Sequence, residues 1–203
     1  MKLRSSVYGW KSVWMEFSEE RAGSFDEGSN VFVMRVPVKG KPFTITFTMR
    51  PKGHKGAVAD TTTAFLPFRS KGEFSFALNN RNWIDDASKI FGAQDIEIGD
   101  DAFDRDYIIK GSDKDQVARL FSNEKLKDLI TEQKSVKLSI HDEPKELAEH
   151  GTVPPGIHVL AFNDKEAINS FDRLNQVYDL MVELLEQLIT IDVASAQDPN
   201  FDL

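Results

Sequence analysis

The sequence contains no cysteine among its 203 residues. This absence excludes disulfides, thiol nucleophiles and cysteine-ligated zinc or iron–sulfur centres, and it suits a reducing compartment. Long apolar runs are also absent: no segment offers about 18 consecutive apolar residues, so the sequence predicts no membrane span. The stretch 1–17 has no continuous apolar region, so we expect no secretory signal and a cytoplasmic location.

Positive charge is scarce and scattered. The chain carries 25 Lys and Arg against 33 Asp and Glu, a formal net charge of −8. Without a basic stripe, nucleic acid is not an expected partner, because phosphate neutralisation dominates such binding. The glycine-rich phosphate loops, the GxSxG nucleophile motif and the HExxH zinc motif are missing as well. No enzyme class and no cofactor are therefore indicated.

The composition is that of an ordinary globular protein, with 40% hydrophobic and 29% charged residues. A chain of this length buries about two thirds of its surface on folding, so it needs no disulfide or metal for stability. We expect a single domain over residues 1–194. The segment 195–203 has no periodicity, and we expect it to be a frayed tail.

Hydrophobic periodicity assigns the elements of the first half. Apolar residues at helical spacing over 7–22 predict a helix whose face packs on a sheet, the alternative being a membrane-surface helix. Alternating residues over 30–40 and 42–50 predict an antiparallel hairpin. The segments 61–70 and 73–80 predict a second hairpin, turning at Lys71-Gly72.

The second half combines helices with two short strands. A short helix is expected at 82–91, and a helical pair at 113–121 and 123–133, with Ser112 and Ser122 as N-caps. Residues 136–140 and 158–162 read as strands, and 164–193 as a long final helix. The sequence therefore predicts an α+β fold. A mainly antiparallel sheet is packed by an N-terminal helix, a middle helical pair and a long C-terminal helix.

Six acidic residues crowd the stretch from Asp95 to Asp106. Their spacing does not match a calcium-binding EF-hand loop, which needs ligands at positions 1, 3, 5 and 12. Two short extended runs, 95–99 and 103–111, explain the stretch better, with acidic residues at the turns and helix starts between and after them. The alternatives are a surface divalent-ion site, for which Asp100 and Asp104 are the candidates, and a catalytic pair of carboxylates.

Histidine offers a second candidate site. His141 ends one predicted strand and His158 lies on the next, so pairing of these strands would bring the two together with Asp142 or Glu143 alongside. Such an arrangement is typical of carboxylate–histidine metal centres. Isolated histidines at strand ends are more often ordinary surface residues. The candidate metal ligands are therefore His141, His158, Asp142, Asp100 and Asp104.

The block that begins QDIEIGDDAFDRDYIIKGSD resembles a motif in a family of uncharacterised bacterial proteins. The matching residues are Asp95, Ile96, Gly99, Asp100, Phe103, Asp104, Ile109, Gly111 and Asp113. The resemblance covers roughly residues 65–135. It implies a bacterial origin and a shared fold, and it transfers no activity and no catalytic residue.

Three functional hypotheses follow. The first is a non-enzymatic cytoplasmic interaction or scaffold domain that forms a homodimer through the broad apolar face of the last helix. That face is made by Leu174, Tyr178, Met181, Leu185 and Leu188. The second is a small-ligand or lipid-binding domain with a cavity between the aromatic strands and this helix. The third is a metal-assisted hydrolase that uses His141, His158 and nearby carboxylates.

Overall fold

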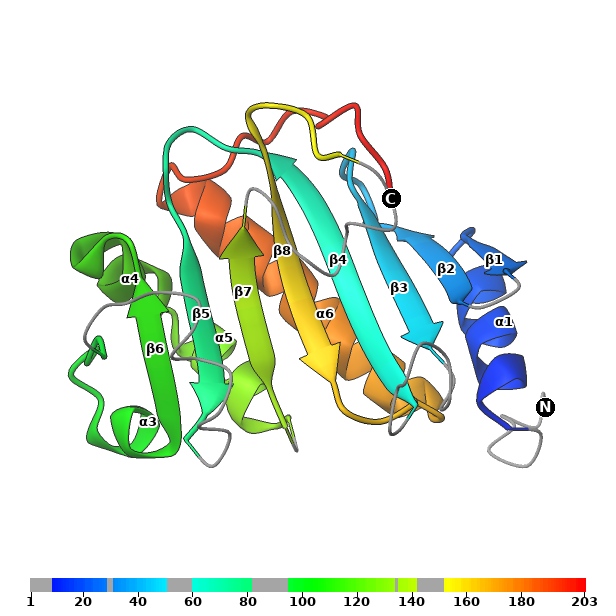
Figure 1. The fold of residues 1–203 in the computed structure, drawn as a ribbon, viewed down its shortest axis with the longest axis horizontal. Helices are drawn as coiled ribbons and strands as arrows, with labels where there is room; N and C mark the ends of the chain where they lie inside the picture. Colours follow the sequence, from blue (N-terminus) through cyan, green and yellow to red (C-terminus); the bar gives the residue numbers. More distant parts are fainter. Residues whose placement is uncertain (1–8, 29–30, 51–59, 82–94, 134, 142–151) are drawn as a thin grey trace.

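The computed structural model describes residues 9–28, 31–50, 60–81, 95–133, 135–141 and 152–203. An eight-stranded antiparallel sheet forms the body of the molecule, and the long helix α6 crosses behind its central strands (Figure 1). The strand order is β1-β2-β3-β4-β8-β7-β5-β6. The predicted α+β fold, with its N-terminal helix and long C-terminal helix, is confirmed.

The strands are β1 Ser24–Glu27, β2 Phe32–Pro37, β3 Thr44–Arg50, β4 Thr61–Arg69, β5 Phe76–Asn80, β6 Tyr107–Gly111, β7 Lys137–His141 and β8 Ile157–Asp164. The helices are α1 Trp10–Glu20, α3 Asp101–Asp106, α4 Lys114–Leu120, α5 Glu124–Thr131 and α6 Phe171–Thr190. The helix expected at 82–91 lies outside the described residues.

The first predicted hairpin is present and the second is not. Strands β2 and β3 pair with Met34 opposite Phe47, as alternation of their apolar residues requires. Strand β4, however, pairs with β8 along its length, from Thr62↔Asp164 to Arg69↔Ile157. Strand β5 pairs with β6 and β7 instead. Alternation fixes which side chains face the core, but it does not choose the neighbouring strand.

Local hydrogen bonds shift several predicted boundaries. The expected extended run 103–111 begins as helix α3, because the Asp100 side chain accepts from the Phe103 amide at 3.2 Å and caps it. Helices α4 and α5 are capped by Asp113 and Asn123, each one residue after the expected serine. Helix α6 begins only at Phe171, after a loop from the end of β8.

The core lies between the sheet and the helices. From α1, Phe17 and Trp14 place their rings 6.3 and 6.2 Å from the ring of Phe47 on β3, edge to face. From α6, the side chains of Leu174, Met181, Leu185 and Leu188 are fully buried. Each large apolar side chain removed from water in this way contributes about 1.5–3 kcal/mol. Side chains from α1 and α6 therefore cover one face of the sheet.

The contact between α5 and α6 depends on a carboxylate. Glu183 accepts hydrogen bonds from the Asn123 amide at 2.8 Å and pairs with Lys125 at 2.5 Å. Burial alone would raise the pKa of Glu183, but the hydrogen bonds from Lys125 and Asn123 outweigh it and hold this pKa below its usual value of 4.5. The folded chain therefore binds fewer protons at this site than the unfolded chain.

We expect a Glu183→Gln variant to have a flatter pH dependence of stability than the wild type. The wild-type contribution is fully present above pH 4.5 and is lost as the pH falls through the lowered pKa, so the two proteins should converge in acid. Urea midpoints measured from pH 7 to pH 3 check this. Glu186→Gln removes a carboxylate from the same helix as a control. Parallel curves for wild type and Glu183→Gln would contradict the assignment.

Candidate functional site

The acidic stretch does not converge on one point. Both side-chain oxygens of Asp104 accept from backbone amides, those of Ile98 and Gly99, each at 3.0 Å. One oxygen of Asp100 caps α3, and the other pairs with Lys127 at 2.6 Å, a contact that lowers the pKa of Asp100. These carboxylates organise a turn and a helix start, which is the interpretation that the sequence favoured.

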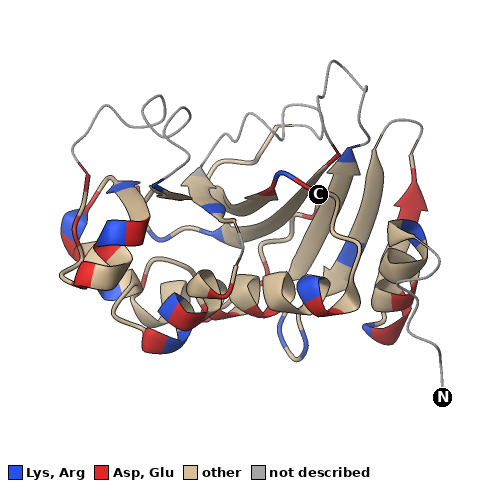
Figure 2. Cartoon of the chain, turned by 90° about the horizontal axis from the view of Figure 1, so that it is seen from below, with Lys and Arg blue, Asp and Glu red and all other residues tan. Residues whose placement is uncertain are grey.

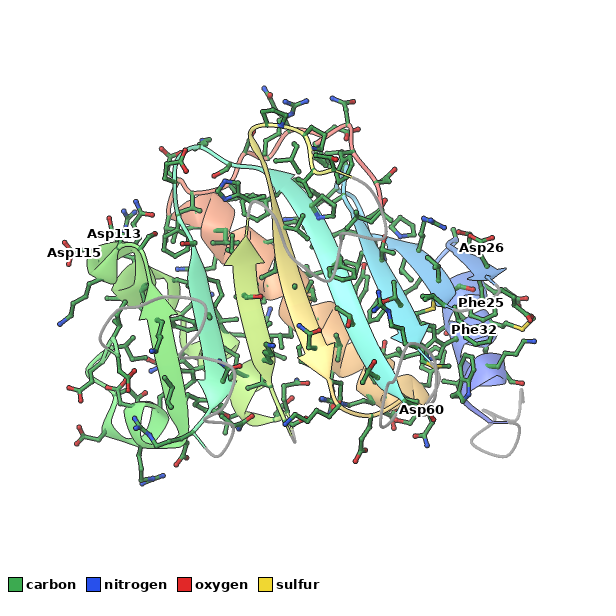
Figure 3. All side chains as sticks on the ribbon, in the orientation of Figure 1. Phe25, Asp26, Phe32, Asp60, Asp113 and Asp115 are labelled. Atoms are coloured by element: carbon green, nitrogen blue, oxygen red, sulfur yellow. The ribbon has the colours of Figure 1, made fainter. Side chains whose placement is uncertain are left out.

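The neighbouring carboxylates at the start of α4 face outward. Asp113 caps this helix by accepting from the amides of Asp115 and Gln116, each at 2.9 Å. In Figure 3, Asp113 and Asp115 project from the edge of the molecule, and Asp60 lies far from them, just before the start of the central strand β4. Across the described ranges, no three His, Asp or Glu side chains are grouped so that they could hold a metal ion.

The two candidate histidines lie on paired strands but do not face one another in the register. Strands β7 and β8 pair as expected, and His141 stands opposite Val159 rather than His158. The His158 ring packs 6.1 Å from the Phe68 ring and is 8% exposed. Asp142 and Glu143 lie outside the described residues, so their part in a metal site stays a prediction. The described residues bring no carboxylate to His158.

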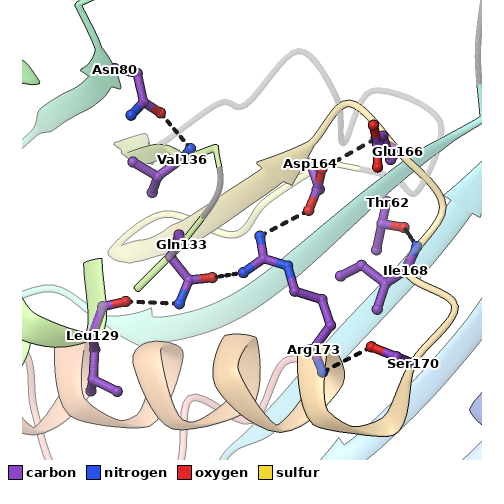
Figure 4. A network of polar contacts seen from close by, with 10 residues as sticks. All are labelled: Thr62, Asn80, Leu129, Gln133, Val136, Asp164, Glu166, Ile168, Ser170 and Arg173. Atoms are coloured by element: carbon purple, nitrogen blue, oxygen red, sulfur yellow. Dashed lines mark hydrogen bonds and ion pairs between the residues drawn. The ribbon is translucent and has the colours of Figure 1, made fainter. Parts of the chain in front are cut away.

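A cleft of about 530 Å³ opens beside the start of α6. Its central feature is an ion pair between Arg173 and Asp164, 2.9 Å apart, with side chains 14% and 9% exposed (Figure 4). Arg173 also donates to Gln133, whose own amide donates to the Leu129 carbonyl at 2.7 Å. Asp164 accepts from the Glu166 amide at 3.2 Å. These charges are satisfied within the chain, so the network ties β8, α5 and α6 together.

The sheet face opposite the helices, here called the second face, carries small polar side chains in register. A row across it runs from β3 to β5 through Thr48, Thr63, Asn163, Lys137 and Asn79. Thr63 donates to Asn163 at 3.0 Å. Thr63, Asn163 and Lys137 remain partly exposed. The helix-facing neighbours of this row are mostly apolar, as with Ala64, Phe162 and Leu138, so the row is the polar half of the strand alternation.

Asn79 is the exceptional member of this row. It is 1% exposed, yet neither its amide nitrogen nor its amide oxygen makes a hydrogen bond to any of the described residues. A buried polar group without a partner costs about 1–3 kcal/mol, so each such group calls for an explanation, and a bound ligand or water is a common one. Nothing in the sequence marks this residue, because an asparagine near a strand end ordinarily indicates a turn.

The segment 195–203, hereafter the tail, lies on the second face and is not frayed. The side chains of Leu203 and Phe201 pack on a cluster formed by Phe65, Val159 and Ala161. Arg35 donates to the Leu203 carbonyl at 2.7 Å. This corrects the expectation from the sequence. The tail lacks periodicity, but Phe201 and Leu203, two positions apart, pack on an apolar cluster of the sheet.

The helix face proposed for a homodimer is largely occupied within the chain. Leu174, Met181, Leu185 and Leu188 are 0% exposed. Tyr178 is partly exposed and donates from its hydroxyl to the Pro37 carbonyl at 3.2 Å. Four of the five named side chains are thus part of the core, and a subunit contact through them would require the core to open. Dimerisation itself stays a prediction.

Charge and membrane features complete the surface. Lys and Arg are interspersed with Asp and Glu over the described helices (Figure 2). The expectation that nucleic acid is not a partner stays a prediction. No helix within the described part of the chain is both long and apolar enough to cross a bilayer.

The fold and the second face together define an α+β protein whose single sheet is covered by helices on one side and crossed by the tail on the other. No family model matches the chain, and no curated protein matches it. Among solved structures, it is similar to the crystal structure of the mycobacterial trehalose monomycolate transport factor A, TtfA, with a TM-score of 0.53 and 6% sequence identity. The match covers 92% of this chain and 97% of that one. At this identity the likeness shows a shared fold alone.

Proposed function

We propose that this chain is a non-enzymatic interaction domain that binds a partner on the second face of its sheet. The observation that carries the proposal is the in-register row of polar side chains on this face, of which Thr63, Asn163 and Lys137 are partly exposed and so within reach of a partner. Asn79 ends this row as a buried amide without a hydrogen bond among the described residues. Hydrogen-bonding surfaces of this kind suit recognition, since each contact gives orientation and specificity.

The alternatives have less support from the described residues. The aromatic side chains that motivated a lipid cavity pack on one another in the core: Phe47, Phe68 and Phe162 are 0% exposed. The hydrolase hypothesis needs carboxylates beside His158, and the described ranges bring no three His, Asp or Glu side chains together. The solved structure of similar fold is that of a transport factor. From it we carry over only the expectation of a binding role, and no substrate.

Site-specific photocrosslinking tests the proposal. We expect p-benzoylphenylalanine in place of Thr63, a partly exposed residue of the second face, to capture a defined protein in cells that produce the chain naturally. The same photocrosslinker at Thr190, an exposed threonine at the end of α6, serves as the matched control and should not capture that protein. Mass spectrometry identifies the captured species.

The captured protein is then purified for a binding measurement. Thr63→Arg should weaken its affinity at least about tenfold, which corresponds to about 1.4 kcal/mol, whereas Thr190→Arg should leave it unchanged. Equal capture at both positions, or a Thr63→Arg variant that binds as well as the wild type, would count against the second face as the binding surface.

A further inference from the structure

The tail rests on a patch that belongs to the most securely paired part of the sheet. The tail-binding patch consists of Phe65 on β4 and of Val159 and Ala161 on β8. These two strands pair along their whole length, and all three side chains are at most 1% exposed. Strand pairing therefore sets the backbone of the patch, and the tail covers its side chains.

The tail binds this patch as an extended peptide would. Phe201 and Leu203 both pack on it, while Asp202 between them is exposed. Residues two apart lie on the same side of an extended chain, so this pattern fits an extended segment. The tail contributes one small apolar cluster that is separate from the main core.

Two arginines of the second face hold the backbone of the tail. Arg35 on β2 donates to the Leu203 carbonyl at 2.7 Å, and Arg69 on β4 donates to the Asp198 carbonyl at 2.9 Å. Arg69 thus contacts a peptide carbonyl within the tail, and Arg35 contacts the main-chain oxygen of Leu203, the last residue of the given sequence. The carboxylate that pairs with Arg35 is that of Asp26 on β1, 2.7 Å away. The patch and its arginines are thus suited to an extended peptide with two apolar side chains.

The attachment of the tail is also less secure than that of the strands. Between Ser195 and Leu203 the bonds to the sheet are few: those of Arg35 and Arg69, one from Thr46 at 3.3 Å, and that of the Ser195 amide at 2.9 Å. Asn200 has a φ of 51°, in the left-handed region that costs a residue with a side chain some strain. Segments with few buried contacts open at lower free energy than a sheet does.

We infer that the tail-binding patch is a docking site for an extended segment of a partner protein with an aromatic and an aliphatic residue two positions apart, and that the chain's own tail is its internal competitor. This inference rests on the proposed interaction role and specifies the chemistry of the partner. A tethered tail acts at an effective concentration in the millimolar range, so it suppresses binding of a free peptide until it is released.

The experiment uses the whole 203-residue chain with its tail released by Phe201→Asp together with Leu203→Asp. The probe is a fluorescein-labelled peptide with the sequence of residues 196–203, AQDPNFDL, blocked at both ends. Fluorescence anisotropy should show that the released chain binds this peptide at least about tenfold more tightly than the wild type does. A control peptide with Ala in place of the Phe and Leu should bind neither protein.

A second variant guards against misfolding of the first. If circular dichroism shows that the double variant is unfolded, Leu203→Ala, which only shortens one side chain, takes its place and should bind the peptide more tightly than the wild type. Arg69→Gln added to the released chain should weaken peptide binding. Equal affinity of the wild type and the folded released variant, or no binding by that variant up to about 1 mM peptide, would overturn the inference.

The outcome can be separated from that of the proposed function. A partner captured at Thr63 without any peptide binding at the tail-binding patch would reject this inference and leave the interaction role standing. Peptide binding without capture at Thr63 would support the tail-binding patch and would count against the polar row as the binding surface.

Discussion

Replacing Trp14 with alanine should lower the free energy of unfolding by about 3–5 kcal/mol, the range for a buried tryptophan truncated in a core. Trp14 is 0% exposed, and its indole nitrogen donates to the Ile168 carbonyl at 2.8 Å across 154 residues of sequence. The substitution therefore removes the packing against Phe47 and also leaves a buried carbonyl unpaired. It would loosen α1 from the loop that precedes α6.

Urea unfolding followed by far-ultraviolet circular dichroism measures this effect without depending on tryptophan fluorescence. The neighbouring residue provides the matched control, since Met15 lies on the same helix and is 42% exposed. Met15→Ala should change the midpoint little, because surface substitutions usually fall within about 0.5 kcal/mol. Similar losses in the two variants would mean that α1 does not pack on the sheet as described.

Arg173→Met should be nearly as damaging, with an expected loss of about 3 kcal/mol, because it leaves the Asp164 carboxylate buried without its cation. It also removes the hydrogen bond to Gln133, which connects α6 to α5. Breaking one half of a buried pair costs more than removing both halves, since the remaining charge has lost its compensation. The variant should also loosen the loop between β8 and α6, because Arg173 on α6 would no longer hold Asp164 at the end of β8.

A double-mutant cycle isolates this pair. Asp164→Asn with Arg173→Met should lose less stability than the sum of the two single variants, because neither charge is then left alone. The control is Arg105→Met, which breaks an exposed ion pair with Asp106 and should leave the urea midpoint unchanged. Strict additivity of the two single losses would show that Arg173 and Asp164 do not interact in the folded chain.

Sequence periodicity predicted which side chains of each element are buried better than it predicted which strands pair. Alternation placed Phe43, Ile45, Phe47 and Met49 on one side of a strand, and all four are buried. It could not show that β4 pairs with β8, because that choice is made by residues about 100 positions away. The strand β1 was missed since it has only four residues, of which Phe25 alone is apolar.

The site was less accessible to sequence reasoning than the fold. The acidic stretch drew attention by its composition, and two of its carboxylates, Asp100 and Asp104, proved to be engaged in a cap and a turn, as turn and cap chemistry indicated. Asn79 had no distinguishing pattern, because its lack of a partner follows from the register of three strands. The tail did carry a signal, Phe201 and Leu203 at a spacing of two, but without the patch on β4 and β8 that spacing predicts nothing.

The central position of β8 has a consequence for folding during synthesis on the ribosome. Thr63 and Asn163, bonded to one another in the middle of the sheet, are 100 residues apart in the chain. All residues of the β2–β3 hairpin are synthesised early, so this hairpin can pair at once. The backbone hydrogen bonds on one edge of β4 stay unformed until β8 has been synthesised. Topologies dominated by such distant pairs fold slowly, and an unpaired apolar edge invites other chains. The nascent N-terminal half should therefore be the stage at which this protein most needs a chaperone.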